Sequence, residues 1–259
     1  MAKLTSVWKR ALPVIKRRLA TLWLATAWPY IGLSICYMIT GFVVRAYHPP
    51  DGQTDPLTLW HSMGVLARLG VVFAYLATIS LPNGFAMAGA SVVVWADLQG
   101  EAVRVRFVFS QIVHVLLRLV VLSFCIGGIC LIGGMFFLVP GVLGFALLSF
   151  AIPVLVIEDT TVSTALRRGF KLSSACPEVL FGLYALVLFI VIVAVVLLFV
   201  VVGSVPPSAD FPWWIGVSVF WVALVPLASI LVIGTTAVVV ELYRGLREQG
   251  GESLSGTQL

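Results

Sequence analysis

Charged side chains are scarce in this sequence of 259 residues. Lys and Arg number 16 and Asp and Glu number 11, so that only 10% of the chain is charged, whereas a soluble globular domain carries about 25%. Apolar residues reach 61%, and the mean hydropathy is +1.10. Such a chain has too little polar surface to face water. The composition excludes a soluble globule, a disordered chain and a secreted disulfide scaffold, and it predicts a multi-pass helical membrane protein.

Residues and motifs with recognisable chemistry are also few. The four cysteines lie in or beside apolar runs, as small packing residues do, and the three histidines show no metal-ligand spacing with any cysteine or carboxylate. The sequence contains no phosphate-binding P-loop and no HExxH, CxxC or GxSxG motif. We therefore expect no enzyme activity, no cofactor, no metal and no nucleic-acid partner.

Long apolar runs dominate the rest of the chain, and a membrane-spanning helix needs about 20 such residues. The N-terminal run follows basic residues, as in a signal peptide, but it is too long for one and lacks a cleavage site, so we expect a retained first span. One membrane domain is expected over residues 1–248, with a flexible cytoplasmic tail at 249–259. The predicted fold is an all-α integral membrane bundle of six transmembrane helices, at about residues 19–44, 62–96, 119–139, 142–157, 179–202 and 213–240.

Prolines mark the expected helix breaks in these spans. The run that contains Pro82 is too long for one straight crossing and too short for two, which favours one kinked span with an amphipathic lead-in. Pro140 and Gly141 predict the turn from the third span into the fourth. Pro226 predicts a break within the sixth span.

The basic residues gather on one side of the predicted bundle. Fourteen of the 16 precede an odd-numbered span or follow the last span, and only Arg45 and Arg68 lie toward the other face. The positive-inside rule then places both termini in the cytoplasm. Arg68 lies about eight residues into its apolar run. There it is either a functional residue at membrane depth or a residue whose long stem reaches the outer head groups.

Three segments resemble one another where the odd-numbered spans begin: WKRALPVIKRRLATLW, EAVRVRFVFSQIVHVLLRL and TALRRGFKLSSACPEVL. Each is basic with apolar residues at helical spacing, and each predicts a short amphipathic helix at the cytoplasmic interface. The even-numbered spans end on acids, with fifteen residues from Pro82 to Asp97 and again from Pro226 to Glu241. The chain is therefore either three repeated helical hairpins or an ordinary hairpin protein with positive charge inside.

The candidate contact residues belong to these segments. Gln111, His114 and Arg118 form one polar stripe, which lines a vestibule, binds a lipid phosphate or is simply the polar face of an interfacial helix. Acids at the span ends predict a structural charge cluster, to which Arg167 or Arg168 reaches back. The acids are Asp97, Glu158, Asp159 and Glu241, and the candidates for lipid or partner contact are Arg68, His114, Arg118, Arg167, Arg168 and Lys171.

Two stretches of the second half carry a resemblance to a bacterial family. In VPGVLGFALLSFAIPVLVIEDTTVSTALRRGFKLSSA a Pro-Gly turn opens a span that ends at an acid before an Ala-Leu-Arg-Arg helix, and IGTTAVVVELYRGLRE closes the last span. They resemble the membrane domain associated with glycerophosphoryl diester phosphodiesterases and its six-span relatives, over about residues 133–248. The resemblance implies a bacterial inner-membrane protein. It does not imply phosphodiesterase activity, because no polar stretch is long enough for the catalytic barrel, and Gly169 stands where such proteins usually have serine.

These observations favour a non-enzymatic membrane scaffold or accessory subunit, which contacts membrane lipids and packs against another membrane protein or complex. The alternative is a transporter or permease component for a lipid or hydrophobic substrate. In that case spans two and six line a path, and the helix at 160–175 docks on a cytoplasmic ATPase. A phospholipid head-group enzyme lacks the acid-rich metal-binding motif that it needs.

Cysteine accessibility tests the predicted topology. Residues Ala46 and Ala209 lie in outer loops of the six-span arrangement, so Ala46→Cys and Ala209→Cys are expected to react with a membrane-impermeant thiol reagent from the non-cytoplasmic side. Labelling of either position from the cytoplasmic side would overturn the arrangement.

Overall fold

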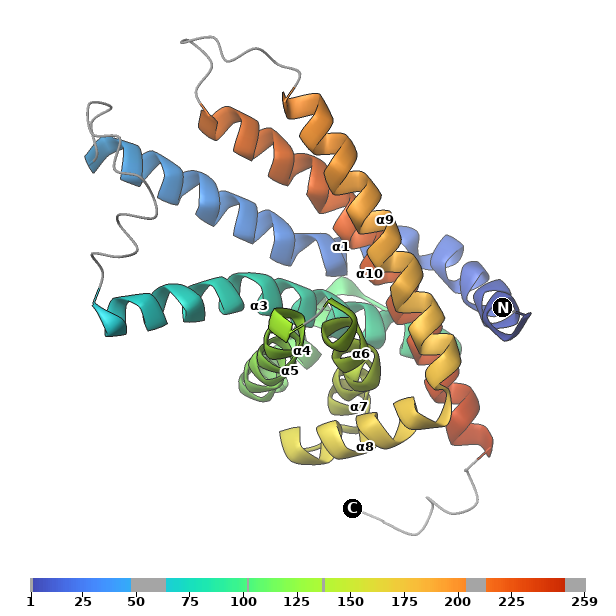
Figure 1. Cartoon of the computed structure of the whole chain (residues 1–259). Coiled ribbons are helices and arrows are strands. Elements are labelled where there is room, and N and C mark those ends of the chain that lie inside the picture. The colour runs from blue at the N-terminus through green and yellow to red at the C-terminus, as the bar shows by residue number, and fades with distance from the viewer. Residues whose placement is uncertain (1, 48–63, 102, 137, 204–212, 250–259) are drawn as a thin grey trace.

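Helices make up all the regular structure in the described part of the chain (Figure 1). The computed structural model describes residues 2–47, 64–101, 103–136, 138–203 and 213–249. Over these ranges the all-α prediction is confirmed, and the predicted tail lies outside them from residue 250 onward. The helices are α1 (Ala2–Tyr47), α3 (Val65–Leu98), α4 (Val105–His114), α5 (Leu116–Phe136), α6 (Leu138–Leu148), α7 (Ala151–Glu158), α8 (Val162–Ala175), α9 (Pro177–Gly203) and α10 (Trp213–Gln249).

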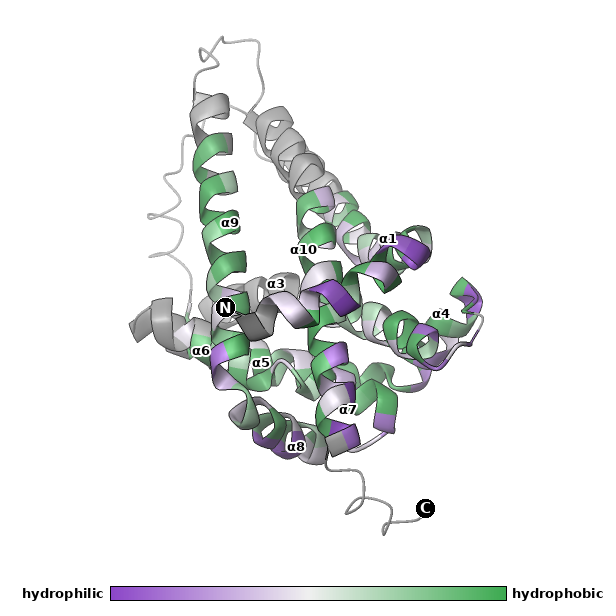
Figure 2. Cartoon of the chain, turned by 90° about the vertical axis from the view of Figure 1, so that its right-hand side faces the viewer, coloured by the Kyte–Doolittle hydropathy of each residue, from purple (hydrophilic) through white to green (hydrophobic). Residues whose placement is uncertain are grey.

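Several of these helices are suited to crossing a membrane. Figure 2 shows hydrophobic residues along the described length of α9, with hydrophilic residues gathered on α8 and near the start of α1. By length and composition, four described segments are long and apolar enough to cross a membrane: Thr5–Cys36, Leu116–Gly133, Pro177–Ala194 and Val225–Glu248. The chain is therefore a membrane protein, and the count of six spans stays a prediction.

The predicted fourth span is two short helices instead of one. The chain turns at Ser149 and Phe150, which separates α6 from α7. These helices have 11 and 8 residues, and at about 1.5 Å per residue neither approaches the roughly 30 Å of a bilayer core. The predicted turn at Pro140 and Gly141 is also wrong. Pro140 lies in the first turn of α6, where its missing N–H would have no partner within the helix in any case.

The prolines of the second and sixth predicted spans do not break their helices. Helix α3 runs through Pro82 as one helix of 34 residues, and α10 runs through Pro226 as one of 37. The second predicted span is thus one continuous helix, and the breaks expected at Pro82 and Pro226 are not found. Proline removes one backbone hydrogen bond, and a membrane helix tolerates this where packing holds both sides in line.

Each basic segment ends at a break just before a long apolar helix begins. Helix α1 kinks at Arg18 (φ −113°, ψ 18°), α4 ends before Val115 (φ −97°, ψ 8°), and α8 ends before Cys176 (φ −140°, ψ 51°). A helix that lies along an interface needs such a break before the chain can cross the membrane. The amphipathic helices are therefore present. Whether they belong to repeated hairpins stays a prediction.

Small side chains let α1, α3 and α10 pack closely. Ala86 and Ala90 of α3 and Ala237 of α10 have no exposed surface. A Cβ at Gly89 of α3 would lie only 2.9 Å from the carbonyl oxygen of Ala25 in α1. Close packing of small residues is a main source of helix association in membranes, because lipid tails are as apolar as the side chains.

Helix α8 lies across α6 and α7 in Figure 1 and touches α7 through Gly169. A Cβ at this glycine would lie 2.7 Å from the backbone nitrogen of Ala151 and 2.8 Å from its Cα. Both obstacles are backbone atoms, which cannot turn aside as a flexible side chain can. A serine hydroxyl has no more room there than a methyl group, so close packing explains the glycine at this position.

Alanine substitution tests this contact. Gly169→Ala is expected to destabilise the protein by about 1–3 kcal/mol through overpacking, against a gain of about 1 kcal/mol in helix propensity. The thermal midpoint in detergent should therefore fall. Gly182→Ala in α9 is the control, because its Cβ would meet nothing within 4 Å, and its midpoint should stay the same or rise. A Gly169→Ala midpoint at or above the wild-type value would contradict the tight contact.

Candidate functional site

Asp97, in the last turn of α3, holds the basic start of the chain. Its side chain is 2% exposed, its Oδ1 accepts a hydrogen bond from Arg18 Nε at 2.7 Å, and Arg17 Nη1 lies 3.7 Å from Oδ2. Arg18 Nη2 also donates to the carbonyl of Glu101 at 3.4 Å. A carboxylate so far from water needs an opposite charge beside it. The pair therefore fixes the kink of α1 against the end of α3.

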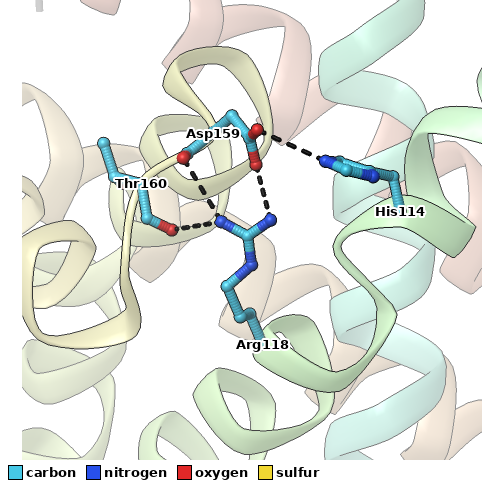
Figure 3. A network of polar contacts seen from close by, with 4 residues as sticks. All are labelled: His114, Arg118, Asp159 and Thr160. Carbon is cyan, nitrogen blue, oxygen red and sulfur yellow. Dashed lines mark hydrogen bonds and ion pairs between the residues drawn. The ribbon is translucent and has the colours of Figure 1, made fainter. Parts of the chain in front are cut away.

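Asp159 holds a second set of contacts, shown in Figure 3. Arg118 Nη2 donates to its Oδ1 at 2.6 Å, while Nη1 donates to the main-chain oxygens of Thr160 at 3.0 Å and Asp159 at 3.2 Å. His114 Nε2 lies 3.4 Å from Oδ2. Asp159 adopts the left-handed conformation (φ 51°, ψ 43°), which Asp accepts more readily than most residues. One arginine thus ties the start of α5 to the turn between α7 and α8.

Glu158 joins three helices. Its carboxylate accepts hydrogen bonds from Arg168 of α8 and from the hydroxyl of Tyr243 in α10. The Tyr243 ring packs edge-on against Trp95 of α3 with centroids 5.6 Å apart, and the Arg247 guanidinium lies 5.6 Å from the centroid of the Trp95 ring. Charge-assisted hydrogen bonds are stronger and more directional than neutral ones. Glu158 therefore sets the positions of α8 and α10 relative to α7.

Glu241 differs from the other acids of the predicted cluster. Its Oε2 is buried and has no hydrogen-bond partner among the described residues. Of the two arginines expected to reach back to an acid, Arg168 reaches Glu158 and Arg167 is exposed. The cluster predicted as one group is therefore divided into separate contacts around Asp97, Glu158 and Asp159.

The predicted lipid or partner contacts fall into distinct groups. The residues that bind carboxylates are His114, Arg118 and Arg168. Arg167 and Lys171 are exposed on α8. The side chain of Arg68 lies outside the described residues, so the choice between a functional and a head-group role stays open.

Sequence reasoning missed Arg18 and Tyr243 as members of the charge contacts. A signal for Arg18 was present, because Arg18 and Arg118 are each the last basic residue before an apolar run, at Leu19 and Leu119. Tyr243 carried no comparable signal, since its role depends on how α10 lies against α7.

The chemistry available to these contacts is the pairing of charges. In the contacts described above, the polar groups are guanidinium, carboxylate, imidazole and phenol groups, and no nucleophile lies beside a general base there. Within the described ranges no group of three or more His, Cys, Asp or Glu is placed to hold a metal ion. Comparison of the chain with known proteins finds no matching family model, curated protein or solved structure. The resemblance to the phosphodiesterase membrane domain therefore stays a prediction.

Removal of the Asp97 carboxylate tests how much its pair stabilises the fold. Asp97→Ala leaves the Arg18 guanidinium without its carboxylate partner. Because the Arg18 side chain is 28% exposed, we expect the free energy of unfolding to fall by about 1–3 kcal/mol, less than for a fully buried unpaired charge. Thermal or denaturant unfolding in detergent measures it. Glu248→Ala is the control, because its exposed pair with Arg244 contributes about 0.3–0.5 kcal/mol. The double variant Asp97→Ala/Arg18→Ala should recover part of the loss, and equal effects of Asp97→Ala and Glu248→Ala would contradict this role.

Proposed function

We propose that this chain is a non-enzymatic protein of the bacterial cytoplasmic membrane that acts as a scaffold or accessory subunit. In this proposal it binds lipid head groups through its basic helices, on the cytoplasmic face, and packs against another membrane protein through its apolar helices. The observation that carries the proposal is the division of the basic residues into those that pair with carboxylates and those that face outward.

Each of the three basic segments contributes one arginine that binds a carboxylate within the protein. These arginines are Arg18, Arg118 and Arg168, each bound to a carboxylate. Most of the other basic side chains in these segments are exposed, and they leave a surplus of positive charge on the surface of the protein. Anionic lipid head groups attract such residues by about 1 kcal/mol each. The exposed residues are Lys9, Arg10, Lys16, Arg104, Arg106, Arg167 and Lys171. Arg17 is also exposed, but its guanidinium lies 3.7 Å from Asp97.

An exposed aromatic residue accompanies the charges on each basic helix. Trp8, Phe107 and Phe170 are 40%, 46% and 52% exposed, and each is next to a basic residue in the sequence. Aromatic rings beside Lys and Arg heads are typical of helices that lie in the interface of a membrane. The same combination on all three helices supports contact with lipid head groups.

Helix α9 supports the second half of the proposal, packing against a partner. Its exposed side chains form a continuous apolar surface, of a kind that soluble proteins rarely present. Lipid tails or a helix of another membrane protein suit this surface equally. The exposed residues include Phe181, Leu186, Phe189, Ile192, Val196 and Leu197.

The alternative, a permease component for a lipid or hydrophobic substrate, is favoured by one observation. An uncharged cleft of about 400 Å³ lies among α3, α5, α6, α9 and α10. Against this alternative, α3 and α10 stay helical at Pro82 and Pro226, so neither proline marks the unwound segment that many transporters use at their binding site.

Lipid retention tests the head-group contact. The triple variant Lys9→Gln/Arg106→Gln/Lys171→Gln removes one outward charge from each basic helix and leaves the carboxylate pairs intact. After purification in detergent from mixed membranes, the ratio of retained phosphatidylglycerol to phosphatidylcholine should fall several-fold. The control Lys9→Arg/Arg106→Lys/Lys171→Arg keeps every charge and should keep the ratio. An unchanged ratio in the glutamine variant would contradict head-group binding.

Purification of the wild-type chain from native membranes tests the choice between the two functions. A stoichiometric larger complex with a membrane protein is the result expected of an accessory subunit. A co-purifying cytoplasmic ATPase would instead support the permease, and a chain that migrates alone would contradict the accessory role.

A further inference from the structure

A polar pocket of about 390 Å³ lies between the end of α3 and the last turns of α10. Pockets for small molecules are typically about 300–1,000 Å³, so this one is at the small end of that range. Its lining includes two arginines and one glutamate, which leaves one net positive charge. The described residues that line the pocket are Trp95, Leu98, Gln99, Arg244, Arg247 and Glu248.

The Arg247 guanidinium is held in place at this pocket by an aromatic platform. It lies over the Trp95 ring, and that ring packs edge-on against Tyr243. Tyr243 is 2% exposed and donates its hydroxyl to Glu158, so the platform is fixed from inside the protein. A cation–π contact uses none of the guanidinium N–H groups in a hydrogen bond. Arg247 is exposed and forms no ion pair within the described part of the chain, so these donors are accessible to a ligand.

Arg244 brings a second guanidinium to the same pocket. It comes three residues before Arg247, and residues at this spacing are neighbours on one side of a helix. Its Nε donates to Glu248 Oε1 at 2.7 Å, and its side chain is 42% exposed. The Nη1 and Nη2 groups of Arg244 are therefore left for a ligand. From α3, the exposed Gln99 adds an amide to the lining.

These donors select an anion that has several oxygen atoms. The one acid among the described lining residues, Glu248, already accepts a hydrogen bond from Arg244. A cation in the pocket would meet two guanidinium groups, and a neutral molecule would gain nothing from the positive charge. A phosphate monoester has three terminal oxygens, which match the fork of a guanidinium group. One such group can therefore bridge both arginines.

The pocket lies at the end of a helix suited to crossing a membrane. The segment Val225–Glu248 is long and apolar enough for this, and arginines at the end of a span lie near the level of lipid phosphates. We propose that the pocket binds one phosphate monoester group, free or on a lipid, through Arg244 and Arg247. This site goes beyond the proposed head-group contacts, because it uses none of the exposed residues of the three basic segments.

Hydrogen exchange in the full-length protein tests the site. The protein is kept in dodecyl maltoside, which carries no phosphate, and dioctanoyl phosphatidic acid, glycerol 3-phosphate or dioctanoylglycerol is added. Phosphatidic acid should slow the exchange of the amides at 244–249 several-fold, because a bound phosphate restrains the local opening of the helix end. Dioctanoylglycerol should not. Protection by glycerol 3-phosphate at an equal or lower concentration would identify a soluble phosphate monoester as the ligand, whereas protection by phosphatidic acid at a lower concentration would identify a lipid head group.

Variants with opposite expected effects separate binding from folding. Arg244→Gln/Arg247→Gln should raise the half-saturating concentration of phosphatidic acid at least about tenfold, since it removes both charged donors. Arg167→Gln/Lys171→Gln is the matched control, because it removes two exposed charges from α8, and it should leave that concentration unchanged. Glu248→Gln frees Arg244 Nε and removes a negative charge, so it should lower the concentration about twofold. A gain in affinity of this kind does not arise from misfolding.

Absence of protection by both phosphate compounds, equal protection by dioctanoylglycerol, or unchanged protection in the variant without Arg244 and Arg247 would each overturn the proposal. The glutamine variant at Lys9, Arg106 and Lys171 should keep the protection at 244–249 although it loses phosphatidylglycerol. The glutamine variant at Arg244 and Arg247 should instead keep its ratio of phosphatidylglycerol to phosphatidylcholine. Failure of this pocket is thereby distinguished from failure of the head-group contacts.

Discussion

An arginine bound to a carboxylate beside the break of a basic helix is the interaction on which the rest of this structure depends. A charged group far from water is tolerated only with a partner in good geometry, and the buried Asp97 meets that condition with Arg18 at the kink of α1. The Asp159–Arg118 pair is more exposed and lies where α4 is followed by α5. Glu158 adds Arg168 and Tyr243, which bring α8 and α10 to α7. Each pair thus joins a basic segment to a neighbouring helix or turn of the bundle.

The features that were predictable from the sequence are those that depend on one segment at a time. Scarce charge and long apolar runs predicted a helical membrane protein, and basic segments with helical spacing predicted short amphipathic helices. The division of residues 142–157 at Ser149 was not predictable, because hydropathy does not change there. At Pro82 and Pro226 the sequence predicted a helix break, whereas the helices continue through both prolines. Whether a proline breaks a membrane helix depends on the neighbours that hold its two halves in line, and a single sequence does not name those neighbours.

The charge contacts were predictable in kind and only partly in detail. Acids at span ends and arginines before span starts lie at the same depth, which predicts pairing. The choice of partner depends on the packing of small residues that bring particular helices together. Gly169 allows α8 to touch the backbone of α7 at Ala151, and this contact places Arg168 within reach of Glu158. A glycine in a sequence is equally compatible with open space, as at Gly182, so the decisive approach is visible only in three dimensions.

The same pairing explains why head-group contact and a neutral cleft are compatible in one chain. Because Arg18, Arg118 and Arg168 are bound to acids, the remaining basic residues are free to face lipid phosphates without loss of the internal contacts. The internal pairs also keep charge away from the middle of the helices, where Asn83 and Ser123 are among the few polar groups. A cleft without charge discriminates against ionic ligands by desolvation alone.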